Sequence, residues 1–292
     1  KREVKLTDRN SSRRKTGVDS PAPQIAASNA GNQNSLLNFS APTEFVELPS
    51  RGALYSSGHP LHNKETLEIK YMTAKEEDIL TSQSLLRKGL AIDRLLESVI
   101  IDKNIDPKSL LVGDRNAILF AIRVTGYGAD YPANVNCGSC GFNHDHNFNL
   151  ENYKDGYKFL DEEKSEFEFS ENGTFFVKLP KSGITVELRP LTGTDEDVLA
   201  KSSEMKSKQR LAESGLTDMF RVMIVSANNI VDRSQISEFI DNMPALDSRY
   251  LRAAYQNVVP NVEFSEAVEC PECGELTETE VPFTAQFFWP DQ

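Results

Sequence analysis

Cys137-Gly138-Ser139-Cys140-Gly141 and Cys270-Pro271-Glu272-Cys273-Gly274 are the two stretches that decide how this chain is organised. They hold all four cysteines of the 292 residues, and each lies between segments whose alternating polarity is typical of strands. A Cys-x-x-Cys-Gly turn places two thiolates on one side of a tight loop, and its glycine permits the backbone conformation that closes the turn. We therefore expect two similar turns, each offering two sulfur ligands.

Four thiolates are a complete ligand set for a tetrahedral structural zinc site. We predict that Cys137, Cys140, Cys270 and Cys273 share one Zn²⁺, although the chain from Cys140 to Cys270 is 130 residues long. Metal bonds that close so long a loop would restrict the unfolded chain much as a cross-link does. An iron or iron–sulfur centre uses the same four ligands, so the identity of the metal stays open.

Three other uses of the cysteines also stay open. The first turn could hold zinc alone with His144 and His146, although these lie closer together than usual, and Thr277 and Thr279 follow the second turn at the same places. A redox-active pair would be expected at the start of a helix, whereas both turns lie between strand-like segments. The turns could also be structural without any metal.

The two cysteine turns end two stretches of similar sequence. The segment 46–52, Val-Glu-Leu-Pro-Ser-Arg-Gly, is echoed by the segment 177–183, Val-Lys-Leu-Pro-Lys-Ser-Gly. Alternating segments at 67–70 and 186–189 follow them, and we expect each to be the second strand of a hairpin. The same strands in the same order indicate an internal duplication.

Helix starts recur in the same order. Thr73 with Glu76 forms a capping-box pattern, and Thr192 with Asp195 repeats it. Further along, Asp114 and Asp247 are each expected to start a helix. Both aspartates lie 23 residues before the first cysteine of their turn.

We therefore expect an α+β fold of two tandem related halves, each a β-hairpin followed by helices and a zinc-ribbon-like strand turn. The expected domains are an extended basic and polar arm over 1–42, a first repeat half over 43–160 and a second over 161–292. The second half ends in an aromatic tail, which would pack the core of that half or dock on a partner. The aromatic residues of the tail are Phe283, Phe287, Phe288 and Trp289.

Charge and composition exclude several classes of protein. The net charge of −12 argues against binding nucleic acid, which needs clustered Lys and Arg. No apolar run approaches the roughly 20 residues that span a bilayer, and the opening Lys1-Arg2-Glu3 shows no signal-peptide pattern. We expect a soluble protein made in a reducing cytoplasm, where paired cysteines usually bind metal. The arm is expected to be disordered alone and ordered by a partner, and its first 20 residues carry a net +4.

No catalytic constellation can be assembled from the sequence. Only four histidines are present, and His59 and His62 lie in a turn-rich loop where they would usually be solvated. Glu76 and its acidic neighbours fall in the first turn of an expected helix, where acids suit the dipole. We therefore predict a protein that is not an enzyme and has no cofactor besides the metal.

Several motifs of the first half resemble one known family. They are Val46-x-Leu48-Pro49-Ser50-x-Gly52, then Gly58-His59-Pro60-Leu61, the segment 68–81 and Leu86-x-Lys88-Gly89. They are similar to the T-even-type bacteriophage baseplate hub subunit family, strongly from about residue 45 to 130 and more weakly beyond. The resemblance covers neither the arm nor the metal prediction, which rests on the cysteines alone.

The resemblance implies a structural protein of the virion that acts in assembly of the central baseplate hub of a contractile tail. Its partners would be other hub, wedge or tail-tube proteins, with no nucleic acid and no membrane. It would be found in the tail baseplate, and in the host cytoplasm during assembly. Two alternatives stay open: an assembly chaperone that is absent from the mature particle, and a zinc-ribbon module that binds nucleic acid.

Overall fold

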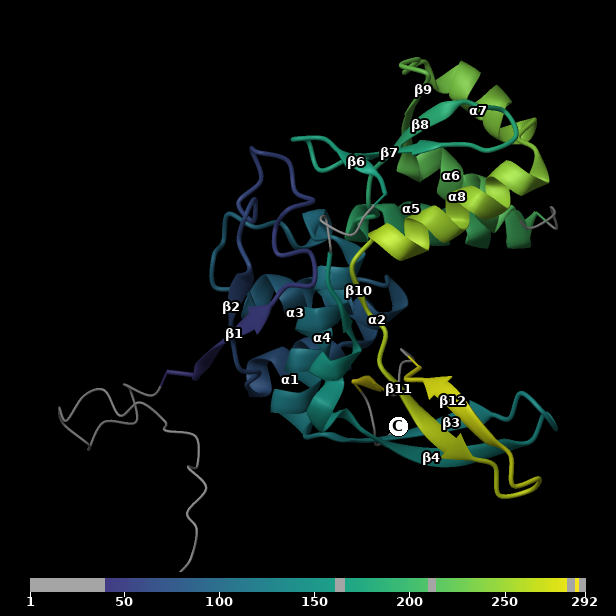
Figure 1. Cartoon of the computed structure of the whole chain (residues 1–292). Coiled ribbons are helices and arrows are strands. Elements are labelled where there is room, and N and C mark those ends of the chain that lie inside the picture. The colour runs from purple at the N-terminus through teal and green to yellow at the C-terminus, as the bar shows by residue number, and fades with distance from the viewer. Residues whose placement is uncertain (1–39, 161–165, 210–213, 283–286, 289–292) are drawn as a thin grey trace, which may run out of the picture. The chain divides into compact units, whose positions relative to one another are not determined.

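The computed structural model describes residues 40–160, 166–209, 214–282 and 287–288, and all of these except Ser40 belong to one compact unit that begins at Ala41. Each expected half opens on small antiparallel strands. In the first, β1 (Thr43–Glu47) pairs with β2 (Thr66–Lys70). In the second, a four-stranded sheet contains β6 (Glu168–Phe169), β7 (Phe175–Lys178), β8 (Thr185–Leu188) and β9 (Ile224–Ala227), in that order. The expected α+β class is therefore confirmed (Figure 1).

Helices follow β2 in the first half and β8 in the second, where β9 lies between two of them. Those of the first half are α1 (Ala74–Thr81), α2 (Gln83–Arg87), α3 (Ala91–Val99), a short 3₁₀ helix (Pro107–Ser109) and α4 (Val112–Tyr127). Those of the second are α5 (Gly193–Lys208), α6 (Gly215–Met223), α7 (Arg233–Asp241) and α8 (Ala245–Val258). Both predicted capping boxes are present, at Thr73 with Glu76 and at Thr192 with Asp195.

The prediction that Asp114 and Asp247 start their helices is wrong by three residues. The N-cap positions are Leu111 in α4 and Pro244 in α8, so both aspartates are the third residue of their helix. Each carboxylate instead accepts hydrogen bonds from a loop, which follows β1 in the case of Asp114 and β7 in the case of Asp247. The matching aspartates therefore join a helix to a distant loop.

The cysteine turns connect the strands of two further hairpins. One consists of β3 (Asp130–Asn136) and β4 (Asn143–Asn149), and the other of β11 (Ser265–Glu269) and β12 (Leu276–Glu280). Figure 1 shows the two hairpins side by side, although each remains a separate two-stranded sheet. Beyond β4, a 3₁₀ segment (Leu150–Gly156) leads to β5 (Tyr157–Lys158), which pairs with β10 (Asn261–Val262).

Two apolar clusters form the core. One is built from β7, β8, β9 and helices α6 to α8. The other contains the first half together with Val262, Val268 and Val281 from the far end of the chain. The chain thus begins in the cluster of the first half, continues through the cluster of β7, β8, β9 and α6 to α8, and then returns to complete the cluster of the first half.

The expected aromatic tail takes part in this return. Phe287 and Phe288 are buried, and the ring of Phe287 contacts Phe120 and Tyr131 edge to face, with centroids 5.3 and 5.2 Å apart. The described part of the tail therefore packs a core, but it is the first half's core and not the second's. Phe283 and Trp289 lie outside the described residues, as does almost all of the expected arm over 1–42.

Within the described part of the chain, none of the helices is long and apolar enough to cross a membrane.

Candidate metal centre

The two cysteine turns have the same backbone structure. In the first, the amide of Cys137 donates to the carbonyl of Phe142 at 2.9 Å, and the amide of Gly141 donates to the carbonyl of Cys137 at 2.8 Å. The second turn repeats both bonds at the matching residues with the same lengths. Gly141 and Gly274 have φ angles of 74° and 69°, which favour glycine because a Cβ would be strained there. Each turn thus holds its two sulfurs in a fixed arrangement.

The structure brings the four sulfurs together. Cys137 Sγ lies 3.7 Å from Cys273 Sγ, Cys140 Sγ lies 3.7 Å from Cys270 Sγ, and all four atoms are within 4.8 Å of one another. These distances exclude disulfides, whose sulfurs are about 2.05 Å apart. A tetrahedron of zinc–sulfur bonds of about 2.3 Å has edges of about 3.8 Å. The four cysteines therefore fit one tetrahedral metal ion.

The electrostatics of the turns also fit a bound cation. Amides of Cys140 and Ser139 donate to the sulfur of Cys137 and lower its pKa to about 7. The amide of Glu275 acts in the same direction on Cys273, but the neighbouring sulfurs, Cys140 with the largest effect, outweigh it and raise that pKa to about 12. Four thiolates this close repel one another, so a cation is needed to hold them all ionised.

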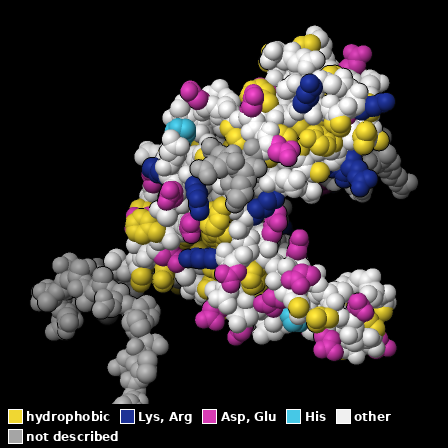
Figure 2. Space-filling view, viewed as in Figure 1, with side chains coloured by type: hydrophobic (Ala, Val, Ile, Leu, Met, Phe, Trp, Pro, Cys, Tyr) yellow, Lys and Arg dark blue, Asp and Glu magenta, His cyan; other side chains and the backbone are white. Residues whose placement is uncertain are grey.

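No basic side chain of the hairpins supplies that positive charge. Residues 130–149 and 261–280, which include both hairpins, contain no lysine or arginine, and the second stretch holds seven glutamates. Figure 2 shows acidic side chains spread over this part of the surface. Cys137 and Cys270 are buried, whereas Cys140 and Cys273 are exposed. A metal here would therefore be bound by two buried and two exposed sulfurs, and a chelator could reach it from the exposed side.

The histidines of the first hairpin lie outside the sulfur group. His146 Nε2 is 3.5 Å from Glu266 Oε2 of the other hairpin, and the His144 ring stacks near Phe142 with centroids 6.2 Å apart. Among the residues that the structure describes, the only group of potential ligands is the four cysteines. The arrangement therefore favours the shared site over zinc binding by the first turn with His144 and His146.

Contacts between the two hairpins support the same arrangement. Glu266 Oε1 accepts a hydrogen bond from the amide of Asn149 at 2.9 Å, and Tyr131 Oη donates to the carbonyl of Pro282 at 2.8 Å. Val135 and Val268 are buried, one from each hairpin. The sulfurs are thus the outer end of a wider contact between residues that are distant in sequence.

The sequence did not reveal the buried network around Asp114. Its carboxylate accepts from the Ser50 amide at 2.9 Å, the Ser50 hydroxyl at 2.5 Å and the Tyr55 hydroxyl at 2.9 Å. The Tyr55 oxygen in turn accepts from the Leu111 amide at 3.1 Å. The matched positions of Ser50 and Asp114 relative to Lys181 and Asp247 were the available signal, but sequence spacing does not show which groups meet.

His59 is also more ordered than expected for a loop histidine. Its Nε2 lies 2.8 Å from Ser109 Oγ, and its ring stacks on Tyr55 with centroids 4.3 Å apart. Burial lowers the pKa of this imidazole. His59 therefore helps to hold the loop after β1, and the expectation of a solvated side chain is wrong for it.

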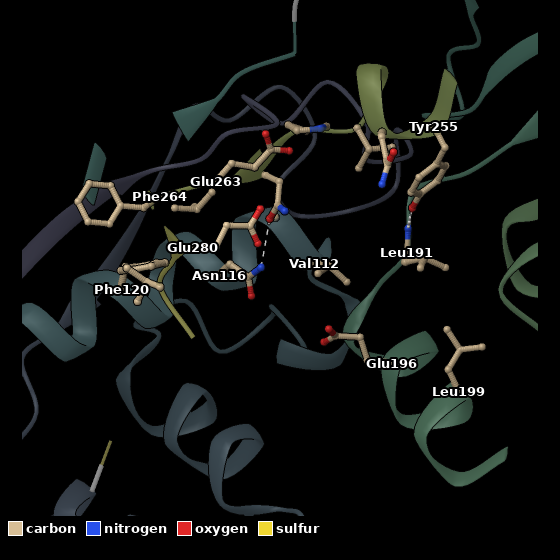
Figure 3. A pocket seen from close by; sticks show the side chains of 17 residues that line it. Val112, Asn116, Phe120, Leu191, Glu196, Leu199, Tyr255, Glu263, Phe264 and Glu280 are labelled. Carbon is tan, nitrogen blue, oxygen red and sulfur yellow. Dashed lines mark hydrogen bonds between the residues drawn. The ribbon is translucent and has the colours of Figure 1, made fainter. Parts of the chain in front are cut away.

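A sizeable cavity lies away from the cysteines. It has a volume of about 660 Å³ and is lined by parts of α4, α5, α8 and β10. Figure 3 shows Asn116 bonded to Asn261 at 3.1 Å, and the Tyr255 hydroxyl accepting from the Leu191 amide at 2.9 Å. The lining residues that the structure describes include no cysteine, histidine, serine or lysine. This set provides no nucleophile with an adjacent base.

Comparison with known proteins gives a match to a family model. No curated protein and no solved structure is significantly similar to the chain. A family model described as T4 bacteriophage base plate protein matches residues 43–289, from the first strand to the end of the aromatic tail. Because this match extends over most of the chain and both cysteine turns, the chain belongs to the T4 bacteriophage base plate protein family.

Proposed function

We propose that this protein is a structural component of the central hub of a contractile-tail baseplate and acts in tail assembly through protein–protein contacts. The observation that carries the proposal is the family match over residues 43–289. Membership of the family gives the chain a structural role in the phage baseplate, in the virion tail and in contact with other tail proteins. The finer role in the hub rests on the resemblance of the first half.

We infer that Cys137, Cys140, Cys270 and Cys273 bind one structural Zn²⁺. The support is the sulfur spacing of 3.7 Å and the lack of basic residues nearby. With four protein ligands, zinc would have no open position for a substrate. Its role would be to fasten the end of the chain to the first half, and the direct measurement is the zinc content of the purified protein.

We also propose that the stretches 43–160 and 161–292 are tandem repeats. The support is the shared order of hairpin, capping box, aspartate at the third helical position and cysteine turn. The apolar clusters divide the chain differently, since the last strands pack with the first half. The repeats would therefore exchange contacts through their ends.

The partners that we propose are other hub, wedge or tail-tube proteins, with the arm over 1–42 engaged by one of them. A zinc-ribbon module for nucleic acid is disfavoured, because residues 261–280 carry seven glutamates and no basic residue, and these would repel phosphate. We propose no enzymatic activity. An assembly chaperone that leaves before maturation is the remaining alternative, and host cytoplasm would be its only location.

Quantitative mass spectrometry of purified virions tests the function. We expect the chain in a fixed ratio to other baseplate proteins, both in whole particles and in isolated baseplates. A capsid protein is the matched control, because it should be lost when baseplates are separated. A chain that is abundant in infected cells but absent from both preparations would overturn the structural role and support the chaperone.

A further inference from the structure

A groove with several basic side chains lies on the first half. It is open to solvent, has a volume of about 740 Å³ and is formed by β2, α1, α2, α3 and the residues after α3. Its cationic side chains are Lys70, Lys75, Arg94 and Lys103, and its apolar ones include Ile79, Leu85 and Ile101. We call this surface the basic groove. Four cations around an apolar floor are unusual in a chain with a net charge of −12.

The chain's own acids neutralise the basic groove only in part. Lys70 Nζ lies 2.7 Å from the buried Glu76, and Arg94 pairs at 2.5 Å with Glu97, which also lines the groove. Lys103 Nζ donates to the carbonyls of Glu97 and Ile100 at the end of α3. Burial and then the charge of Lys70 lower the pKa of Lys103. The groove is therefore prepared for an acidic, partly apolar segment.

One surface of this same chain has that chemistry. Residues alternate along β11 and β12, so Val268 and Thr277 face the first hairpin while Glu269, Leu276 and Glu278 share the outer face. Leu276 is 64% exposed and lies directly across from Glu269. Glu280, also exposed, continues the row. We call this outer face, with Leu276 surrounded by glutamates, the acidic face.

Within one chain the two surfaces do not meet. Of the described residues, those that line the basic groove all come from positions 70–103, and none belongs to either hairpin. The first hairpin cannot replace the acidic face, because its outer positions carry mainly asparagine, such as Asn134, Asn143 and Asn147. The complement of the groove is therefore specific to β11 and β12.

We propose that the acidic face of one copy binds the basic groove of a second copy of this chain. Leu276 enters between Ile79, Leu85 and Ile101, while Glu269 and Glu278 pair with Lys75 and Arg94. Two different surfaces are used, so the contact is heterologous and builds a ring or a row of copies unless two chains engage reciprocally. The contact is separate from the proposed hub function, since a baseplate protein could serve there as a single copy.

Sedimentation velocity of the zinc-loaded full chain over a range of concentrations tests the proposal. We expect reversible association that is lost at about 1 M salt, where the screening length is about 3 Å. The double variant Lys75→Glu/Arg94→Glu should weaken association at least about tenfold, because like charges then face each other. The variant Glu269→Lys/Glu278→Lys should weaken it equally, and Leu276→Ser should also reduce it.

Mixing gives the decisive result. Each double variant alone is expected to stay monomeric, whereas an equimolar mixture of the two should associate, since the reversed charges again match. Lys201→Glu/Arg252→Glu, which reverses two exposed charges outside the groove, is the matched control and should associate like the unmodified chain. Circular dichroism and zinc content verify that each variant is folded.

Three results would overturn the proposal. They are a chain that is monomeric at every concentration, groove variants no weaker than the control, and a mixture that fails to associate. Association that persists in both double variants would show that copies meet through another surface. None of these results bears on the presence of the chain in virions, so the two proposals fail independently.

Discussion

Asp114 and Asp247 hold the same position, the third residue of their helices, but lie in different surroundings. Asp114 accepts three hydrogen bonds from Ser50 and Tyr55, which are 0% and 3% exposed. Asp247 accepts two, from the amides of Lys181 at 2.7 Å and Ser182 at 2.9 Å, and both donors lie in an exposed loop. Both carboxylates join the third residue of a helix to a strand-connecting loop, after β1 for Asp114 and after β7 for Asp247.

The pKa values of these two acids shift in opposite directions. Burial is the largest influence on Asp114, and it raises the pKa despite the bonds from Ser50 and Tyr55. Burial also raises the pKa of Asp247, but the amides of Lys181 and Ser182 outweigh it and lower the net value. Asp114 thus belongs to a buried network of side-chain and backbone hydrogen bonds, whereas Asp247 binds the backbone of an exposed loop.

Substitution of a cysteine in either turn should have the same effect. This should also be the largest loss of stability among these predictions. We expect about one zinc per chain by elemental analysis, and Cys137→Ser and Cys270→Ser should each lose it, because the proposed ion would be shared by all four sulfurs. Each should lower the free energy of unfolding by more than about 5 kcal/mol, since structural zinc contributes about 10–16 kcal/mol in zinc-dependent domains. Denaturant unfolding of the zinc-loaded proteins measures this.

Ser139→Ala is the matched control within the first turn and should keep the metal. Zinc retained in Cys270→Ser but lost in Cys137→Ser would show that the first turn binds alone. A chain truncated after Asp161 that still binds one zinc would also show independent binding by the first turn.

Removing the side chain of either aspartate should lower the free energy of unfolding by less than loss of the metal. The loss should differ between Asp114 and Asp247. Asp114→Ala should cost about 3 kcal/mol, because the Ser50 and Tyr55 donors are left buried without partners. Asp247→Ala should cost only about 1 kcal/mol, because water can reach the amides of the exposed loop. Urea unfolding measures both, with exposed Asp155→Ala as the control. Equal costs would show that the two contacts are energetically equivalent despite their surroundings.

The smallest expected effect is on the pH dependence of stability. Lowering the pH should act in opposite directions through Asp114 and Asp247. A lowered pKa makes Asp247 stabilising above its unfolded value of about 3.9, and that stability is lost as pH falls through its folded pKa. The raised pKa of Asp114 acts oppositely, because its ionised form becomes costly as pH rises from about 3.9 through the folded value.

Asp247→Asn should therefore reduce the loss of stability between about pH 5 and pH 3, and Asp114→Asn should increase it. Urea unfolding at stepped pH values measures both slopes, and the metal centre contributes the same background to each protein. Slopes that change in the same direction would contradict the opposite shifts.

Local signals predicted much of the fold because neighbouring residues determine them. The capping boxes at Thr73 and Thr192 and the strands around each cysteine turn depend on contacts between residues that are near in sequence. The strand patterns at 46–52 and 177–183 come from local alternation, although Val46 pairs with Leu67 across a longer loop. The clustering of the four cysteines was also foreseen, since a structural metal needs more ligands than one turn offers. The family resemblance of the first half is confirmed by the match over 43–289.

Contacts between distant residues could not be foreseen in the same way. An aspartate before a helical pattern suggests a cap, but the partners of Asp114 lie 59 and 64 residues earlier in the chain. The aromatic tail was expected to pack the second half or a partner, yet Phe287 reaches Phe120. Hydrophobic burial is not directional, so the sequence indicates that Phe287 is buried but does not indicate which residues it contacts.

The return of the chain to the core of its first half determines the order in which the two cores can be completed during protein synthesis. A ribosome that has completed residues 43–160 has made neither β10, which pairs with β5, nor Phe287, which packs on Phe120. The second cluster, Phe175 to Val258, is finished while the first still lacks these pieces. The middle of the polypeptide can therefore mature before its beginning, and a nascent chain released early would expose an unfilled core where the finished chain has a closed one.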